Sequence, residues 1–178
     1  QRQVMAGFLA RVTMSRPLVT LKTATSLDGM IALGDGAKRW ITGSVMRRYV
    51  HLQRSRSDGL LSAIGTVLAD DPEFTCRTPG LEADSPHRFI LDANLRTPAD
   101  ARMFETAPEF GVTIFCREDC DPKAAVALRE EGAEVQSVSQ DGAGRLLLAE
   151  VMAVIAETGC GSLPVSYTHL TLPTILSV

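Results

Sequence analysis

The sequence predicts an α/β protein in which helices flank a mainly parallel β-sheet. Short apolar runs rich in β-branched residues alternate with amphipathic segments, in the order strand, helix, strand, strand, helix, strand, helix. Hydrophobic residues make up 45% of the 178 residues and charged residues 22%. This is the composition of a globular domain and not of a disordered chain.

The first strand is predicted at residues 17–25, a run of β-branched and apolar residues. The first helix is predicted at residues 44–57, where Thr42 or Ser44 can cap the first turn. Its apolar face consists of positions i, i+1, i+4 and i+5, namely Val45, Met46, Tyr49 and Val50, continued by Gln53. Its other face bears Arg47, Arg48, Arg54 and Arg56.

The later elements have clear boundaries. Strands are predicted at residues 59–65, 87–92, 111–116 and 133–138. Between the last two strands lies a helix that Asp121 caps, with Pro122 at its first position and Gly132 at its end. A second amphipathic helix covers residues 144–159.

The C-terminal stretch departs from this alternation. A buried strand should open after Leu163, but Pro164 interrupts it, and residues 164–178 show no hydrophobic period. This stretch resembles the translated read-through of a sequencing-library adapter, so a non-native tail is predicted. The alternative is a genuine edge strand followed by a C-terminal arm.

Composition excludes several classes of function. The net charge of −3 offers no basic face for nucleic acid, and no apolar run is long enough to span a membrane. The N-terminal residues lack the continuous apolar core of a signal peptide, so a cytoplasmic location is expected. The four cysteines show no metal-binding spacing, which indicates reduced structural thiols.

Two loops are candidates for a ligand site. Residues 25–43 match neither an EF-hand nor a P-loop, and the local interpretation is a structural turn in which Trp40 is a hydrophobic plug. In residues 64–72, Thr66 offers a hydroxyl and an amide at a possible helix start, where a phosphate can bind. Asp70 and Asp71 could instead bind Mg²⁺, although Pro72 makes joint coordination awkward.

Arginines supply the third candidate feature. Arg54 and Arg77 each lie near the end of an element, and a guanidinium group binds two phosphate oxygens at once. A solvated arginine remains the alternative for each. No motif for a nucleophile or a metal cage is present, which favours chemistry supplied by a bound cofactor.

Four ordered motifs carry a resemblance to a known family. "RPLVTLKTATSLDGMIA", "RWITG", "GTVLADDPEFTCR" and "RFILD" resemble the reductase domain of the bacterial bifunctional riboflavin-biosynthesis deaminase/reductase. The resemblance covers residues 16–163 and implies a dihydrofolate reductase-like fold that lacks its last strands. It also implies NADPH-dependent reduction of 5-amino-6-(5-phosphoribosylamino)uracil, in which the ribosyl group becomes ribityl.

The resemblance also assigns roles to individual positions. The implied cofactor contacts are Ala24, Trp40, Thr66, Asp70 and Ala93. The implied substrate contacts are Lys38, Arg54, Phe74 and Arg77. No catalytic side chain and no metal are implied. The turn before Trp40 departs from the family, since it reads "GDGAKRW" where a glutamate or serine is common.

The resemblance leads to a division into three parts. Residues 1–15 are expected to be a linker from a deaminase domain that the chain lacks, residues 16–163 an incomplete reductase domain, and residues 164–178 the tail. The alternatives to an active reductase are a non-catalytic remnant, a pteridine reductase of the same fold and a Mg²⁺-dependent phosphosugar enzyme. A homo-oligomer is possible on this sequence.

Overall fold

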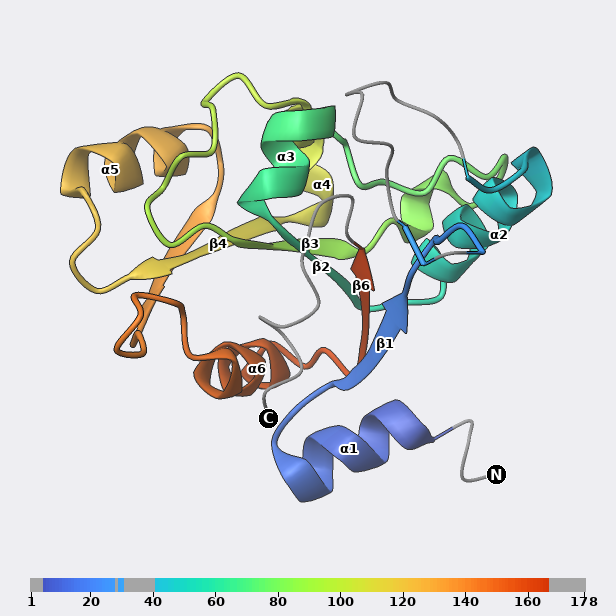
Figure 1. The fold of residues 1–178 in the computed structure, drawn as a ribbon, viewed down its shortest axis with the longest axis horizontal. Helices are drawn as coiled ribbons and strands as arrows, with labels where there is room; N and C mark the ends of the chain where they lie inside the picture. Colours follow the sequence, from blue (N-terminus) through green and yellow to red (C-terminus); the bar gives the residue numbers. More distant parts are fainter. Residues whose placement is uncertain (1–4, 28, 31–40, 167–178) are drawn as a thin grey trace.

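The computed structural model describes residues 5–27, 29–30 and 41–166 (Figure 1). The helices are α1 (Ala6–Met14), α2 (Ser44–Arg54), α3 (Ile64–Asp70), α4 (Ala107–Phe110), α5 (Pro122–Glu130) and α6 (Leu148–Glu157), with short 3₁₀ turns at Glu82–Asp84 and Arg102–Thr106. The strands are β1 (Leu18–Lys22), β2 (Gly59–Ala63), β3 (His87–Leu91), β4 (Val112–Arg117), β5 (Glu134–Val138) and β6 (Ser162–Ser166).

These strands form one parallel sheet in the order β1-β6-β2-β3-β4-β5. Helices cover both of its faces, with α3, α4 and α5 on one side and α6 on the other (Figure 1). The predicted α/β class with a mainly parallel sheet is therefore confirmed. Because the strands are parallel, their carboxyl ends lie along one edge, where ligands bind in sheets of this kind.

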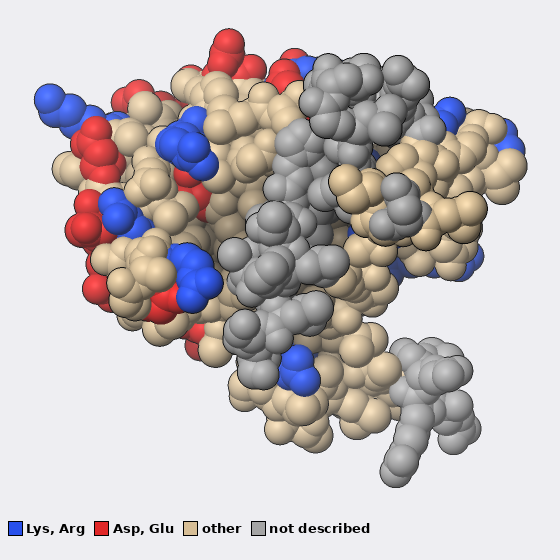
Figure 2. Space-filling view, viewed as in Figure 1, with Lys and Arg blue, Asp and Glu red and all other residues tan. Residues whose placement is uncertain are grey.

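Two apolar clusters fill the space between the sheet and its helices. One packs α3, α4 and α5 against Ile90 and Ile114, and the other packs α6 against Phe89 and Phe115. Successive residues of β3 and β4 thus enter opposite clusters, as the two-residue period of a strand requires. Charged side chains gather over the α5 side of the molecule, whereas the surface over α1 is mostly uncharged (Figure 2).

The strand and helix signals of the sequence are largely confirmed. Asp121 caps α5 as predicted, since its carboxylate accepts a hydrogen bond from the Lys123 amide at 2.9 Å. The predicted cap of α2 is wrong, because Gly43 occupies that position and no side chain caps the helix. The strand predicted at residues 59–65 ends at Ala63, and residues 64–70 form the seven-residue helix α3. Residues 6–14 of the predicted linker form α1.

The predicted interruption at Pro164 is also wrong. Strand β6 continues through Pro164 to Ser166 and lies between β1 and β2, so it is not an edge strand. Five residue pairs join β6 to β1, but only Leu61↔Val165 joins it to β2. A proline removes one amide from one of these two ladders, and the sparse β6–β2 ladder tolerates this loss. Residues 167–178 of the predicted tail lie outside the described residues.

Asp58 fixes the start of β6 beside β2. One of its carboxylate oxygens accepts hydrogen bonds from the amides of Gly161 and Ser162, at 3.0 and 2.9 Å, and from the Ser162 hydroxyl at 2.9 Å. The Asp58 amide in turn donates to the Ser162 hydroxyl oxygen at 3.0 Å. These bonds join positions about a hundred residues apart, so they help to set the register of the inserted strand.

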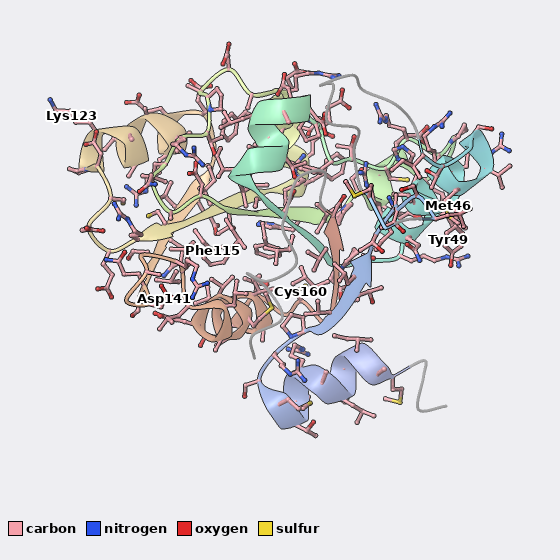
Figure 3. The ribbon with its side chains drawn as sticks, in the orientation of Figure 1. Met46, Tyr49, Phe115, Lys123, Asp141 and Cys160 are labelled. Atoms are coloured by element: carbon pink, nitrogen blue, oxygen red, sulfur yellow. The ribbon has the colours of Figure 1, made fainter. Side chains whose placement is uncertain are left out.

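The orientation of α2 differs from the prediction. Val45, Met46 and Tyr49 are 71%, 47% and 51% exposed, whereas Val50 and Gln53 of the same predicted face are half-buried, so only the second half of that face is covered. Met46 and Tyr49 lie on the outer part of the helix, away from the strands (Figure 3). The half-buried positions include Arg47, His51 and Arg54, with the spacing of a helical face. A helix turns polar side chains inward where it covers a polar site.

Candidate functional site

Three of the predicted cofactor contacts lie at the carboxyl edge of the sheet. Ala24 follows the end of β1, Thr66 lies in the first turn after β2, and Ala93 follows β3 by two residues. The sheet places the ends of β1, β2 and β3 along one edge, with only β6 between the first two. The structure thus brings together positions that are up to 69 residues apart in the chain.

Helix α3 follows β2 without a loop and presents an open backbone. Gly65, its second residue, has no heavy atom within 4 Å of the position that a Cβ would take. Thr66 is buried at 4% exposure, and Asp70 ends the helix. The first turn of α3 can therefore be approached closely by another molecule at Gly65, while Thr66 faces the protein.

Asp71 has a structural role in the turn that follows α3. It adopts a left-handed conformation, with φ of 42°, and its carboxylate accepts a hydrogen bond from the Arg102 amide at 3.0 Å. Among the described residues, no group of three or more His, Cys, Asp or Glu side chains could hold a metal ion. The Asp70–Asp71 pair thus gives no support to the Mg²⁺ hypothesis.

A basic cluster lies beside this edge, and we define it as Lys22, His51, Arg54 and Arg77. A guanidinium NH of Arg54, at the end of α2, donates to the Thr75 carbonyl at 2.9 Å. The Arg77 amide donates to Nδ1 of His51 at 3.1 Å. Lys22 ends β1 and lines a small cavity together with Arg54. Three segments of the chain therefore build the cluster: β1 supplies Lys22, α2 supplies His51 and Arg54, and the segment after α3 supplies Arg77.

Mutual repulsion and burial perturb the protonation of the basic cluster. Burial, and secondarily the charge of Arg77, lowers the pKa of Arg54 to about 10. Burial, followed by the charges of Arg54 and Arg77, lowers the pKa of His51. Burial and Arg54 lower the pKa of Lys22 in the same way. Since Nδ1 of His51 accepts a hydrogen bond, the ring is neutral with its proton on Nε2.

No carboxylate of the described residues balances the charge of the basic cluster. Among the residues described, neither Arg54 nor Arg77 forms an ion pair, and the buried Nε of Arg54 has no hydrogen-bond partner. Cations that are held together without a counter-ion are characteristic of anion sites, because a bound anion relieves the repulsion between them.

Residues 74–77 are held in place by the core on one side. The Phe74 side chain is 3% exposed and belongs to the apolar cluster with α3 and α4, and its φ of 60° is strained for a non-glycine residue. Buried Arg88 donates to the carbonyl of Glu73, at 3.3 Å, and so fixes the preceding residue. A substrate contact at Phe74 would therefore involve its backbone, whereas the exposed Arg77 offers its side chain.

Sequence reasoning found some members of this site and missed others. Arg54 and Arg77 were predicted, and the structure brings them together. Lys22 and His51 are not among the predicted site residues. The available signal was the inward face of α2, in which His51 precedes Arg54 by three positions. Lys38 and Trp40 lie outside the described residues.

The cavity between β1, α2 and β6 is too small for a substrate. Its volume is about 20 Å³. It is lined by the polar residues Lys22, Gln53, Arg54 and Ser166 and by the apolar residues Val50, Leu60, Pro164 and Val165. A space of this size holds about one water molecule. Any larger ligand would have to bind over the edge of the sheet and not inside this cavity.

The fold and the site first define a class: a parallel α/β domain with a cationic site at the carboxyl edge of its sheet. Comparison with known proteins then assigns the family. The family model described as the RibD C-terminal domain matches residues 17–166, and the chain belongs to this family. The resemblance carried by the four sequence motifs is thereby confirmed.

Individual relatives agree with this assignment. The riboflavin biosynthesis protein RibD of Aquifex aeolicus (strain VF5) is 34% identical over 134 residues, which cover 75% of this chain and 36% of that protein. The solved structure of Acinetobacter baumannii RibD, form 1, has a TM-score of 0.76 and 26% identity, covering 93% of this chain and 44% of the other.

A third relative carries a more explicit description. The Thermotoga maritima structure is described as a diaminohydroxyphosphoribosylaminopyrimidine deaminase/5-amino-6-(5-phosphoribosylamino)uracil reductase, with a TM-score of 0.70 and 29% identity over 92% of this chain and 42% of that one. The predicted dihydrofolate reductase-like fold is confirmed by these structures. The chain spans less than half the length of each of these three relatives.

Proposed function

We propose that this chain forms the cofactor and substrate site of an NADPH-dependent reductase that acts on 5-amino-6-(5-phosphoribosylamino)uracil. The observation that carries the proposal is the basic cluster, which lies beside the carboxyl end of β1 and whose two arginines form no ion pair with any described residue. The 5-phosphate of such a substrate is the anion that two guanidinium groups would bind. Family membership supports the same substrate class.

The residues at the edge of the sheet fit a dinucleotide cofactor. The unobstructed backbone at Gly65 leaves room for a bulky group, and the amides of a first helical turn favour negative charge there. Ala24, Thr66, Asp70 and Ala93 would hold the cofactor along the ends of three strands. Ala93 is itself fixed, because its carbonyl accepts a hydrogen bond from the Arg117 amide at 3.2 Å.

When bound, the nicotinamide supplies the hydride that reduces the ribosyl group to ribityl. The task of the chain is then to bind and orient the substrate. Arg54 and Arg77 would hold the phosphate and so fix one end of the substrate over the sheet. Neutral His51 keeps Arg77 in position through the Arg77 amide. Because no catalytic side chain is required for this role, alignment is the main contribution of the chain.

The alternatives make different demands on the same residues. A pteridine substrate carries no phosphate, so a pteridine reductase would not need two arginines without counter-ions. A non-catalytic remnant would bind ligand without turnover. The phosphate interaction therefore discriminates between these functions more sharply than the fold does.

The test is the replacement of Arg77 by alanine. Arg77→Ala should weaken binding of the phosphorylated substrate by ten- to a hundred-fold and leave its dephosphorylated analogue almost unaffected, as measured by titration calorimetry. Arg48→Ala is the matched control, because Arg48 is an exposed arginine of the neighbouring helix. Equal losses for the two ligands in Arg77→Ala would contradict the phosphate role, as would an equal effect of Arg48→Ala.

A further inference from the structure

Two thiols approach each other at the end of β4, away from the basic cluster. The Cys116 thiol donates to the Cys120 sulfur, with an Sγ–Sγ distance of 3.0 Å. Cys116 belongs to β4 and is 1% exposed, whereas Cys120 lies in the following turn and is half-buried. Both cysteines are free. The sequence alone predicts structural thiols here, because a separation of four residues matches no metal motif.

The backbone holds this pair in place. The Cys120 amide donates to the Arg117 carbonyl at 3.2 Å and closes a turn, so both sulfurs lie on one side of it. The turn joins β4 to α5, in which Phe115 and Lys123 are labelled in Figure 3. A disulfide requires the sulfurs to approach to about 2 Å, which is about 1 Å closer than they are. Rotation of the half-buried Cys120 side chain could supply a movement of this size.

We propose that Cys116 and Cys120 form an intramolecular disulfide when the protein meets a hydroperoxide. Cys120 reacts first, because its sulfur is the one that a small oxidant can reach. Its sulfur takes one oxygen from the hydroperoxide, the O–O bond breaks, and water or an alcohol leaves. The Cys116 sulfur then displaces the hydroxyl group of the Cys120 sulfenic acid, and the departing hydroxide takes the Cys116 proton as water. Two thiols thus lose two electrons to one peroxide.

The chemical environment assigns distinct roles to the two cysteines. Burial, together with the hydrogen bond and charge of Cys120, raises the pKa of Cys116 to about 12. Cys116 is therefore protonated and inert toward an oxidant, and it can react only with a partner already beside it. A sulfenic acid formed 3.0 Å away is such a partner. The pair then has the arrangement of a reactive and a resolving thiol.

The pair also lies next to the carboxyl edge of the sheet. Its neighbours Phe115 and Arg117 hold the end of β3, since the Asp92 amide donates to the Phe115 carbonyl at 2.9 Å and the Arg117 amide donates to the Ala93 carbonyl at 3.2 Å. A disulfide at Cys116 would act on both bonds. An effect on cofactor affinity through Ala93 rests on the proposed function, whereas formation of the disulfide does not.

Peptide mapping tests the proposal directly. The reduced, purified chain is treated with hydrogen peroxide, its remaining thiols are alkylated after denaturation, and it is digested with trypsin without reduction. Trypsin cleaves after Arg117 and Lys123, so Cys116 and Cys120 fall in separate peptides, residues 103–117 and 118–123. The expected product is these two peptides joined by a disulfide, from protein that migrates as a monomer on a non-reducing gel.

Cys160 is the internal control. It is also buried, with a pKa raised by burial to about 12, but its thiol donates to a backbone carbonyl of Ser162 and not to a second thiol. It should remain fully alkylatable under the same treatment. In Cys116→Ser, dimedone should trap a Cys120 sulfenic acid that the unchanged protein scarcely accumulates. Should that variant fold poorly, the peptide map of the unchanged chain still decides.

The proposal is overturned if Cys116 is recovered alkylated while Cys120 is oxidised to sulfinic or sulfonic acid. It is equally overturned if the cross-links join Cys120 to Cys76 or Cys160, or if they appear only in dimers. Failure of NADPH to bind would leave the peptide map unchanged, so this proposal and the proposed function can fail separately.

Discussion

Replacement of Arg54 by methionine separates what this side chain contributes to binding from what it costs in stability. Methionine has a similar length and no charge. The pKa of Arg54 is lowered from an ordinary value of 12.5 to about 10, mainly by burial. At about 1.4 kcal/mol per pKa unit, the folded state holds this charge at a cost of about 3 kcal/mol.

The substitution also removes a favourable interaction. The hydrogen bond to the Thr75 carbonyl, at 2.9 Å, is lost, and leaving that carbonyl unpaired costs about 1–3 kcal/mol. The two effects nearly cancel. We therefore expect the free energy of unfolding of Arg54→Met to be unchanged or raised by up to about 2 kcal/mol, although a buried side chain has been altered. Affinity for the phosphorylated substrate should fall at least tenfold, since a charge-assisted hydrogen bond contributes about 1.5–3 kcal/mol.

Urea unfolding measures the first quantity and titration calorimetry the second. Arg48→Met, on the exposed side of the same helix, should change the free energy of unfolding by less than about 0.5 kcal/mol and leave binding unchanged. A loss of more than about 2 kcal/mol in Arg54→Met would show that Arg54 stabilises the fold, which refutes the reasoning. Undiminished phosphate affinity would refute the role in binding.

Two further predictions test the inserted strand and the neutral histidine. Leu163 of β6 is fully buried, so Leu163→Ala should lower the free energy of unfolding by about 3 kcal/mol in urea unfolding. The control Val45→Ala, at an exposed position, should lower it by less than about 0.5 kcal/mol. A loss in Leu163→Ala as small as that of the control would argue that β6 is not a core strand. The pKa of His51 lies below its ordinary 6.5, so the folded state binds fewer protons and loses stability as the pH falls below that value. Urea unfolding of His51→Gln should therefore show a free energy of unfolding that depends less on pH between 7.5 and 5.5 than that of the unchanged protein. The same pH dependence in both proteins would contradict a lowered pKa of His51. The pKa of His87 is also lowered, but His87 is present in both proteins, so its contribution cancels in the comparison.

Local chemistry explains which elements could be predicted from the sequence. The short apolar runs of β2, β3 and β4 become strands whose central residues are buried, and Asp121 with Pro122 marks the start of α5. These signals act over a few residues, so they hold without knowledge of the tertiary structure. The long helix α6 is likewise set by its own apolar period.

Other features depend on contacts that no local pattern contains. The outward orientation of Val45, Met46 and Tyr49 follows from what α2 covers, which overrides the apolar spacing. Strand β6 accepts Pro164 because its pairing with β2 is sparse, a property of the assembled sheet. The standard expectation that a proline ends a central strand fails for that reason.

The site residues also divide into those that the sequence can indicate and those that depend on the fold. The strand-end positions Ala24, Thr66 and Ala93 are implied by the family resemblance, and the parallel sheet brings the ends of their strands to one edge. Lys22 could not, since its proximity to Arg54 arises from folding. His51 lies one helical turn from Arg54, but its hydrogen bond to the Arg77 amide likewise depends on the fold. The closeness of Cys116 and Cys120 likewise depends on how the turn after β4 closes.

Titration of the chain with NADPH, followed by the fluorescence of Trp40, tests the central claim most directly. Trp40 is the only tryptophan, so the signal comes from one position in the loop that the sequence motifs assign to the cofactor. The account predicts saturable quenching with half-saturation below ~1 mM, the usual upper range for enzyme ligands. Circular dichroism confirms that the chain is folded during the titration. Fluorescence that stays constant up to millimolar NADPH in the folded chain would contradict the cofactor site.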